Sequence, residues 1–291
     1  METLNQQSAQ PPSSPPKPLS GWLCASDVDG TLVTAVGAVL PPANKRAIAR
    51  FQRLGGRFTI ASGRSVPSAR LVIKRLGLWE TPAVILNGGG VYDFAENKML
   101  RYHPIPKEGA ALAFELCRQF PCLQFQALRR DSSHILNVGT ASFFASGANR
   151  LPRKFHRTLT GFPRDDWGKA IFYGRRDDIA ELAGYCRSLR DAPLLFMESS
   201  GVSFEILAPG VHKGSALLEL ADILGVDRER LAGIGNYDND AGLLECSAVT
   251  AAPANSPESF KARAQYIVCP DRKGAVAEFL GILERMETSG R

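Results

Sequence analysis

The sequence predicts an α/β protein in which a doubly wound, mostly parallel sheet carries a second α/β unit as an insertion. Short apolar runs alternate with helical patterns from residue 21 onward, as in parallel strands joined by helices. This rhythm changes after about residue 100 and resumes near residue 213. We therefore expect a core of residues 21–105 and 205–291, with residues 106–204 as the inserted unit.

The first strands of the core are expected at 22–26, 57–61 and 83–86. A helix over 44–54 follows the first strand, and Gly55-Gly56 marks its end. A second helix carries Ala69, Val72, Ile73 and Leu76 on one face. Each of these strands ends in a polar or Gly-rich loop. Because ligands of such sheets bind at the carboxyl ends of the strands, we expect the functional site there.

The inserted unit and the return to the core have their own patterns. In the insertion we expect helices at 107–120 and 178–189, strands at 123–128, 134–138 and 170–173, and a closing hairpin of 194–198 and 202–207. Residues 139–166 are rich in Gly, Arg and Pro. In the returning core we expect a helix from Lys213, strands at 231–234, 248–252 and 266–268, and a final helix at 273–286.

Composition favours an ordinary globular protein that binds small anions. The chain has 291 residues, of which 44% are hydrophobic and 22% charged, enough for a sizeable core. No apolar run approaches the ~18 residues of a membrane span. The net charge is +6, but the basic residues are scattered, so phosphorylated small molecules are favoured over nucleic acid. We expect no membrane partner, and a monomer or a homodimer.

The cysteines and residues 1–20 indicate the cellular compartment in which the protein is expected. The six cysteines form no Cys-x-x-Cys pair, and the four histidines show no metal-ligand spacing, so zinc is disfavoured. Several cysteines lie in apolar segments, as buried thiols do in a reducing compartment. Residues 1–20 are rich in Pro, Ser and Gln and lack the apolar centre of a signal peptide. We expect a disordered tail there and a cytoplasmic protein.

The segment Asp27-Val28-Asp29-Gly30-Thr31 follows the first apolar strand and is the strongest chemical signal. Strand alternation puts both carboxylates on one side, and Gly30 permits a sharp turn. Mg²⁺ binds such carboxylates together with substrate phosphate oxygens. One carboxylate could attack phosphorus and the other protonate the leaving oxygen. An EF-hand loop is excluded, because its twelfth position is Ala38 rather than Glu and a strand precedes it.

Three further loops bring polar groups to the same edge of the sheet. They are Ser62-Gly63-Arg64, Asn87-Gly88 and the segment from Gly235 to Asp240, and Lys213 opens a helix nearby. Each of these is weak alone, since a Ser-Gly-Arg is usually a turn. Together they supply the nucleophile, metal ligands and hydrogen-bond donors that phosphoryl transfer requires.

These motifs resemble those of the haloacid dehalogenase superfamily, in particular the Cof-type phosphatases with a large α/β cap. The resemblance extends from about Trp22 to Leu283. It implies a Rossmann-like core, a Mg²⁺ cofactor, an aspartyl-phosphate intermediate, and a cap over residues 106–204 that closes over the substrate and selects the leaving group. The small phosphorylated metabolites that it implies include sugar phosphates, pyridoxal phosphate and flavin mononucleotide.

The resemblance also implies roles for individual residues. Asp27 would be the nucleophile and Asp29 the acid and base, while Ser62 and Lys213 would hold the transferring phosphoryl group. The metal would be bound by Asp27, Asp29, Asn236 and Asp240. The matched positions for substrate binding are Gly30, Thr31, Gly63, Arg64, Asn87, Gly88 and Asn239. In the cap, Arg129, Arg130, Arg153 and Lys154 could meet an anionic leaving group, although we expect most of them to be solvated surface side chains.

One position departs from the family pattern. The family has an aspartate metal ligand where this chain has Asn236, so we expect weakened Mg²⁺ binding. This departure keeps a second reading open, a catalytically weak or silent protein that binds phosphorylated metabolites. A phosphotransferase or mutase on the same scaffold is a third reading. A P-type ATPase is excluded because the sequence contains no membrane spans.

Overall fold

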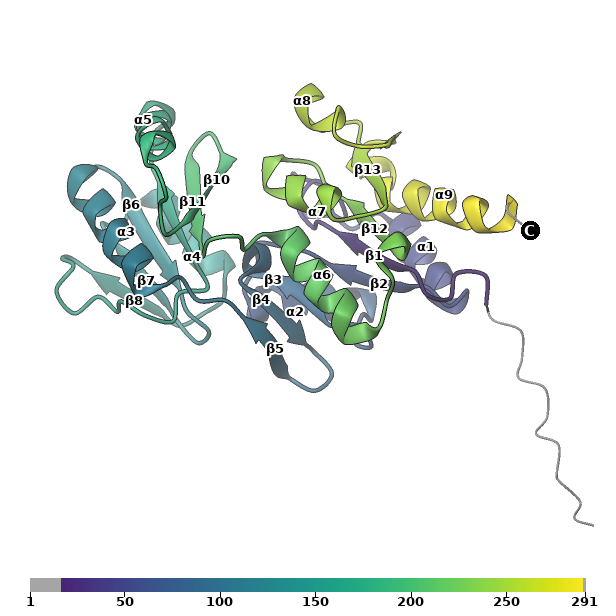
Figure 1. The fold of residues 1–291 in the computed structure, drawn as a ribbon. Helices are drawn as coiled ribbons and strands as arrows, with labels where there is room; N and C mark the ends of the chain where they lie inside the picture. Colours follow the sequence, from purple (N-terminus) through teal and green to yellow (C-terminus); the bar gives the residue numbers. More distant parts are fainter. Residues whose placement is uncertain (1–16, 290–291) are drawn as a thin grey trace, which may run out of the picture.

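The computed structural model describes residues 17–289 (Figure 1). Its central sheet has five strands in the order β14-β13-β12-β1-β2, and all four neighbouring pairs are parallel. These strands are β1 (Leu23–Ser26), β2 (Arg57–Ile60), β12 (Leu231–Ile234), β13 (Val249–Pro253) and β14 (Tyr266–Val268). The residues of β1, β12 and β13 are all buried, as expected for a parallel sheet covered on both faces, whereas Tyr266 and Ile267 of the edge strand β14 are exposed.

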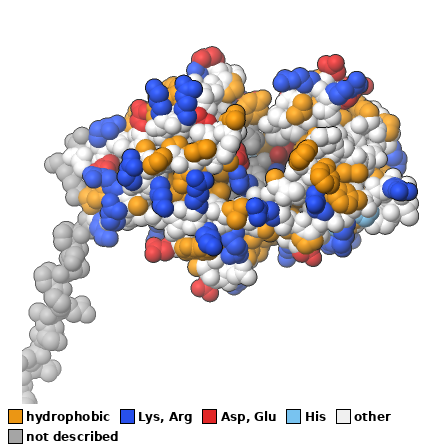
Figure 2. Space-filling view, turned by 180° about the vertical axis from the view of Figure 1, so that it is seen from behind, with side chains coloured by type: hydrophobic (Ala, Val, Ile, Leu, Met, Phe, Trp, Pro, Cys, Tyr) orange, Lys and Arg blue, Asp and Glu red, His pale blue; other side chains and the backbone are white. Residues whose placement is uncertain are grey.

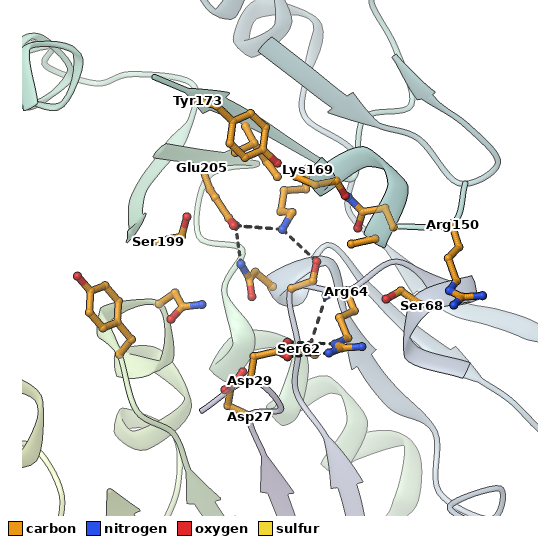
Figure 3. A pocket seen from close by; sticks show the side chains of 18 of the residues that line it. Asp27, Asp29, Ser62, Arg64, Ser68, Arg150, Lys169, Tyr173, Ser199 and Glu205 are labelled. Atoms are coloured by element: carbon orange, nitrogen blue, oxygen red, sulfur yellow. Dashed lines mark hydrogen bonds and ion pairs between the residues drawn. The ribbon is translucent and has the colours of Figure 1, made fainter. Parts of the chain in front are cut away.

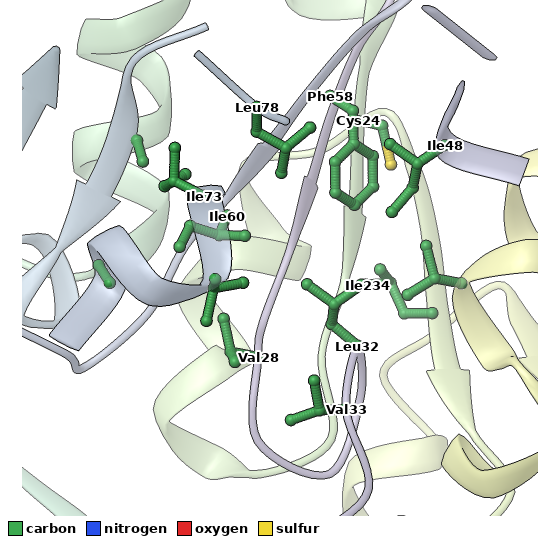
Figure 4. Close-up of a cluster of buried hydrophobic side chains, with 14 of the residues drawn as sticks. Cys24, Val28, Leu32, Val33, Ile48, Phe58, Ile60, Ile73, Leu78 and Ile234 are labelled. Carbon is green, nitrogen blue, oxygen red and sulfur yellow. The ribbon is translucent and has the colours of Figure 1, made fainter. Parts of the chain in front are cut away.

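Helices cover both faces of this sheet. On one face lie α1 (Pro42–Arg53), α2 (Val66–Leu76) and α9 (Ala275–Ser289), and on the other α6 (Lys213–Leu224), α7 (Ala241–Glu245) and α8 (Glu258–Lys261). Strand alternation divides the core accordingly, because Cys24 packs toward α1 while its neighbours Leu23 and Ala25 pack toward α6. Figure 4 shows the first of these clusters, where Phe58 and Ile60 are completely buried. The predicted doubly wound α/β core is confirmed.

The third predicted strand belongs to a different sheet. β3 (Ala83–Ile85) pairs antiparallel with β4 (Gly90–Asp93), which pairs antiparallel with β5 (Lys98–Tyr102). β3 lies beside β2 and meets the parallel sheet at one isolated bridge, between Ala61 and Val84, where the Ser62 amide donates to the Val84 carbonyl at 3.0 Å. The short 3₁₀ turn Leu86–Gly88 sends the chain back on itself, so the expected helix crossover does not follow.

The inserted unit contains a six-stranded sheet in the order β10-β11-β9-β6-β7-β8. Its pairs are antiparallel except β7 with β8. Its strands are β6 (Gln124–Leu128), β7 (Ser133–Leu136), β8 (Arg153–His156), β9 (Lys169–Tyr173), β10 (Leu195–Ser200) and β11 (Ser203–Leu207), and its helices are α3 (Lys107–Gln119), α4 (Thr140–Ala148) and α5 (Arg176–Ser188). The aromatic cluster around Phe125, Phe172 and Trp167 packs this sheet against α3 and α5.

The structure shifts two predicted boundaries. Residue 205 lies in the middle of β11, which pairs with β9 and β10, so the inserted unit continues to Leu207. We propose residues 106–207 as this unit and call it the cap. The expected tail is shorter than 1–20, since Leu19 is completely buried and its amide donates to the Leu54 carbonyl at 2.9 Å. Residues 1–16 of that expected tail lie outside the described residues.

Smaller elements complete the description. Three more 3₁₀ turns span Arg228–Arg230, Asp238–Asp240 and Asp271–Lys273. α4 and β8 lie within the Gly-, Arg- and Pro-rich stretch for which the sequence predicts no element, whereas the predicted hairpin of β10 and β11 is confirmed. Within residues 17–289, no helix combines the length and the apolar character needed to cross a bilayer.

Candidate active site

Three chain segments meet at the carboxyl edge of the parallel sheet. The Asp27 amide donates to the Ile234 carbonyl of β12 at 2.9 Å, directly after β1 ends. On the other side, the Ala61 amide donates to the Ser26 carbonyl at 2.8 Å, which places the following Ser62 beside Asp27. The Asn87 amide in turn donates to the Ser62 carbonyl at 3.0 Å. The sheet register therefore brings the first, second and third polar loops together, as the sequence predicts.

A buried lysine joins two carboxylates beneath this edge. The Lys213 Nζ lies 2.6 Å from Oδ1 of Asp27 and 2.5 Å from Oδ1 of Asp240. The side chains of Lys213 and Asp240 are fully buried, and that of Asp27 is 10% exposed. Lys213 is the first residue of α6, so the helix start delivers the ammonium group to the floor of the site.

The pKa values of Asp27 and Lys213 follow from burial and from the presence of two carboxylates beside one ammonium group. Burial and then the nearby Asp240 carboxylate raise the pKa of Asp27, Lys213 opposes both, and the balance is a pKa raised to about 7. Burial alone would lower the pKa of Lys213, but the two carboxylates outweigh it and raise the pKa overall. The lysine therefore stays charged, and a further cation near Asp27 would favour its carboxylate form.

Asp240 uses both of its oxygens within the protein. Oδ1 accepts from Lys213, and Oδ2 accepts from the amides of Asn236 at 2.8 Å and Tyr237 at 3.2 Å. This arrangement shapes the loop after β12 and fixes Lys213. It differs from the predicted role of Asp240 as a metal ligand, because its oxygens are committed to protein donors and it has no exposed surface.

Asn236 lies against the turn that follows Asp27. Gly30 has a φ of +86°, and a Cβ there would lie 2.6 Å from Nδ2 of Asn236, so only glycine fits without displacing that amide. The Thr31 hydroxyl donates to Oδ1 of Asn236 at 3.2 Å. The amide of Asn236 is therefore held beside the loop that carries Asp27 and Asp29.

The oxygen donors here fit a hard cation, although the set is weak. Oδ2 of Asp27 accepts no hydrogen bond from residues 17–289, so it is available. Together with the amide oxygen of Asn236 it provides the oxygen ligands that Mg²⁺ prefers, and substrate phosphate and water can complete such a set. Among the described residues, no group of three or more His, Cys, Asp or Glu side chains is placed to hold a metal.

Asp29 lies at the mouth of the site and is paired with Arg64. The Arg64 guanidinium donates to both carboxylate oxygens, with Nε 3.0 Å from Oδ2 and Nη2 2.6 Å from Oδ1. The Asp29 side chain is 55% exposed, in contrast to the buried Asp27. The two aspartates of the first motif therefore have different surroundings, one fixed on the floor and one at the entrance.

A cavity of about 680 Å³ lies above Asp27, between the loops of the core and the cap (Figure 3). Figure 2, a view of the back of the molecule, shows Lys and Arg side chains spread over that face rather than gathered in one patch. The cavity is lined from the core by Asp27, Asp29, Ser62, Gly63, Arg64, Ser68, Leu71, Asn87, Asn236, Tyr237 and Asn239, and from the cap by Ala145, Ala148, Asn149, Arg150, Lys169, Ile171, Tyr173, Ser199 and Glu205.

Most of the predicted site residues come together here, and some take other places. Lys213 and Asp240 lie beneath the cavity floor, and Gly30 and Thr31 lie behind Asn236. Gly88 does not line the cavity. Its φ is +105°, and a Cβ there would lie 2.3 Å from the His212 carbonyl oxygen, so its role is close backbone packing.

The cap cations that face the cavity are not the predicted ones. Arg130 pairs with Asp166 at 2.9 Å and Arg153 stacks on Phe143, whereas Arg150 and Lys169 line the cavity. Lys169 lies 3.2 Å from Glu205, and the Asn87 side chain donates to Glu205 at 2.5 Å. The sequence signal that could have found them is a charge at a buried strand, since Lys169 directly precedes the strand expected at 170–173 and Glu205 lies within the one expected at 202–207.

Comparisons with known proteins agree with this fold. A family model described as haloacid dehalogenase-like hydrolase matches residues 24–280. Pyridoxal phosphate phosphatase YbhA of Escherichia coli K12 is 24% identical over 266 residues, which cover 88% of this chain and 96% of the relative. A phosphoglycolate phosphatase of Archaeoglobus fulgidus is 34% identical over 263 residues, which cover 89% of this chain and 96% of the relative. The structure of a haloacid dehalogenase-like hydrolase from Bacillus subtilis has a TM-score of 0.78 at 20% identity, and covers 89% of this chain and 98% of that one.

The chain belongs to the haloacid dehalogenase-like hydrolase family. It is a phosphoric monoester hydrolase, in agreement with the family match and with the phosphatases among its relatives.

Proposed function

We propose that the protein is a Mg²⁺-dependent phosphatase of small phosphorylated metabolites that acts through an aspartyl-phosphate on Asp27. The observation that carries the proposal is the position of the Asp27 carboxylate. It lies on the floor of a large polar cavity, with one oxygen held by Lys213 and the other available. A buried, oriented carboxylate of this kind suits nucleophilic attack.

The reaction follows from the roles of the surrounding groups. The Asp27 oxygen that does not hold the metal attacks phosphorus, the ester bond to the leaving oxygen breaks, and Asp29 gives that oxygen its proton. A water molecule then attacks the phosphorus of the aspartyl-phosphate while Asp29 takes a proton, and inorganic phosphate leaves. Asp29 must release Arg64 before either proton transfer, because the guanidinium occupies both of its oxygens.

Charge stabilisation comes from several sources. The Ser62 hydroxyl and the Lys213 ammonium hold the transferring group as its charge spreads over the equatorial oxygens. Asp27 and Asn236, rather than Asp29 with its Arg64 pair, would hold Mg²⁺, which when bound supplies positive charge for the phosphate oxygens. Asp240 keeps Lys213 and the Asn236 loop in place.

The cavity supports a small polar leaving group. Oδ1 of Asn87 is buried and has no hydrogen-bond partner among the described residues, so it can accept from a hydroxyl or amine. Arg150 contributes a positive charge on the cap side, whereas the charge of Lys169 is balanced by Glu205. Sugar phosphates, pyridoxal phosphate, phosphoglycolate and flavin mononucleotide are therefore reasonable compounds to test. We also propose a cytoplasmic protein, monomeric or homodimeric, whose unpaired cysteines fit a reducing compartment.

A metabolite screen with Mg²⁺ followed by Asp27→Asn tests the proposal. The variant keeps the side-chain shape but removes the attacking charge, so turnover should fall by several orders of magnitude. Beryllium fluoride, an acyl-phosphate mimic, should bind the wild type and bind the variant poorly. Asp222→Asn, on the exposed side of α6, is the matched control and should behave as the wild type. Substantial turnover by Asp27→Asn would rule out the aspartyl-phosphate.

Two other candidate functions are tested by the same screen, and the weak metal set favours the first. A protein that binds phosphorylated metabolites without hydrolysing them would bind compounds in the same screen with no phosphate release. A phosphotransferase or mutase would instead pass the phosphoryl group to an added sugar, which product analysis detects.

A further inference from the structure

Two charged side chains of the cap are buried against the core. Lys169 begins β9 and Glu205 lies in β11, and their residues are 3% and 7% exposed. Strand pairing puts both on the cap face that turns toward the cavity, together with Ile171. Burying an ion pair costs desolvation, and an apolar pair of similar size often gives equal or greater stability. Cap stability alone therefore does not account for them.

The remaining hydrogen bonds of this pair all go to the core (Figure 3). Lys169 Nζ donates to the Gly63 carbonyl at 3.0 Å, and Glu205 Oε2 accepts from Asn87 Nδ2 at 2.5 Å. The Asn87 backbone amide holds the Ser62 carbonyl at 3.0 Å. Two consecutive carbonyls, those of Ser62 and Gly63, are thus fixed by groups that this network connects.

These carbonyls flank the hydroxyl that faces the phosphoryl site. The Arg64 amide lies 3.3 Å from Ser62 Oγ, so the hydroxyl depends on the conformation of the same turn. Gly63 packs closely against Asn87, because a Cβ there would lie 3.0 Å from Asn87 Oδ1. Movement of Lys169 would release the Gly63 peptide and, through it, Ser62.

We propose that Lys169 and Glu205 are positioning residues that couple the closed cap to the placement of the Ser62 hydroxyl. The pair orders the Ser62-Gly63-Arg64 turn when the cap sheet lies over the cavity and leaves it less ordered when the cap moves away. The inference rests on the proposed function, in which Ser62 holds the transferring phosphoryl group.

The direction of the hydrogen bonds gives a sharp test. An ammonium group only donates and a carboxylate only accepts, so a swapped pair keeps the ion pair but can bond neither Gly63 nor Asn87 in the same way. We therefore compare the neutral variant Lys169→Met/Glu205→Gln, which leaves no lone buried charge, with the swapped variant Lys169→Glu/Glu205→Lys. Arg187→Met, which removes an exposed ion pair with Glu198 in the same cap, is the control.

The neutral and swapped variants should each lower kcat by roughly 10- to 100-fold, as a misplaced catalytic group does, with KM changing far less. The loss should be equal for p-nitrophenyl phosphate and for a metabolite ester, because the pair acts through Ser62 and not on the leaving group. In a Ser62→Ala background, the neutral changes should cost only about twofold more. Arg187→Met should match the wild type, and thermal unfolding should show that all variants are folded.

Three results would overturn the inference: an undiminished loss in the Ser62→Ala background, full activity of the swapped variant, or a loss confined to the metabolite ester. Calorimetric measurement of inorganic phosphate binding repeats the comparison of the neutral changes in the wild-type and Ser62→Ala backgrounds, without turnover. The neutral changes should weaken phosphate binding in the wild type but not in Ser62→Ala, and equal weakening in both would also overturn it. Because this readout does not need Asp27 as nucleophile, it separates failure of the coupling from failure of the proposed mechanism.

Discussion

At the scale of single residues, the site is organised around one ammonium group between two carboxylates. Lys213 neutralises one of the two charges, so the buried group retains a net negative charge when both aspartates are ionised. A buried, uncompensated charge is costly, and a bound cation beside Asp27 relieves it. In the proposed metal site, Asn236 stands where the family pattern has an aspartate, so the proposed ligand set carries one negative charge fewer.

Replacing Asn236 by aspartate should lower the Mg²⁺ concentration needed for half-maximal activity. A unit charge at ~4 Å is worth about 4 kcal/mol at an effective dielectric constant of 20. Desolvation reduces the net gain to about 1–3 kcal/mol, or roughly 5- to 150-fold in Mg²⁺ affinity. A Mg²⁺ titration of wild type and Asn236→Asp measures the shift.

The charge-matched control is Asn239→Asp on the same loop, which should alter KM more than the Mg²⁺ requirement. Coincident titration curves for wild type and Asn236→Asp would mean that residue 236 does not contact the metal. The fourth motif would then be misaligned with the family.

At the scale of elements, the sequence predicted those strands and loops that depend on residues close together in the chain. Apolar runs located β1, β2 and β12, and the polar residues that follow them identified most of the site. They could not assign β3 to its sheet, because partner choice depends on the reversal at Asn87, a tertiary feature. Lys169 and Glu205 were missed as site residues for a similar reason. Their role depends on contacts with residues more than 30 positions away in the sequence.

A histidine pair on β7 and β8 should make cap stability depend on pH. His134 Nδ1 lies 2.9 Å from His156 Nε2, so one ring must act as acceptor. Burial first, then the charges of His156, Lys154 and Arg129, lower the pKa of His134 to about 4, while Asp131 opposes them weakly. Burial and Lys154 lower the pKa of His156 as well.

The sign follows from proton binding. Between about pH 4 and 6.5 the unfolded chain protonates His134 and the folded cap does not, so stability falls as pH drops through this range. One proton contributes at most about 1.4 kcal/mol per pH unit. Urea unfolding of wild type and His134→Gln between pH 4 and 8 should show a shallower slope for the variant below pH 6.5. Parallel curves would contradict the assignment.

At the scale of the whole molecule, the cap has a hydrophobic core of its own. Trp167 is completely buried among Phe114, Phe125 and Phe162, and α3 and α5 cover that face of the sheet. The opposite face turns toward the cavity and carries Ile171 and Tyr173. This division supports the proposal that residues 106–207 form one unit with its own folding cluster.

Residues 106–207 expressed alone should therefore fold. Trp167 should show blue-shifted fluorescence, and cooperative loss of that signal in urea should accompany loss of far-ultraviolet circular dichroism. Trp167→Phe is the control that assigns the signal. Emission typical of exposed tryptophan, with no cooperative transition, would show that the cap needs the core to fold.

The glycines at residues 88 and 89 limit how this molecule could be recombined with its relatives. A Cβ at Gly88 would strike the His212 carbonyl oxygen at 2.3 Å, and one at Gly89 would strike the Gly168 carbonyl oxygen at the same distance. This turn therefore packs against the backbone at His212, in the segment that returns from the cap to the core, and against the cap backbone at Gly168. A chimaera that took only residues 106–207 from a relative would place that cap against core segments of this protein that are not fitted to it. Transplanting the cap with residues 86–89 and 208–212 would move the mutually fitted backbone segments as one module.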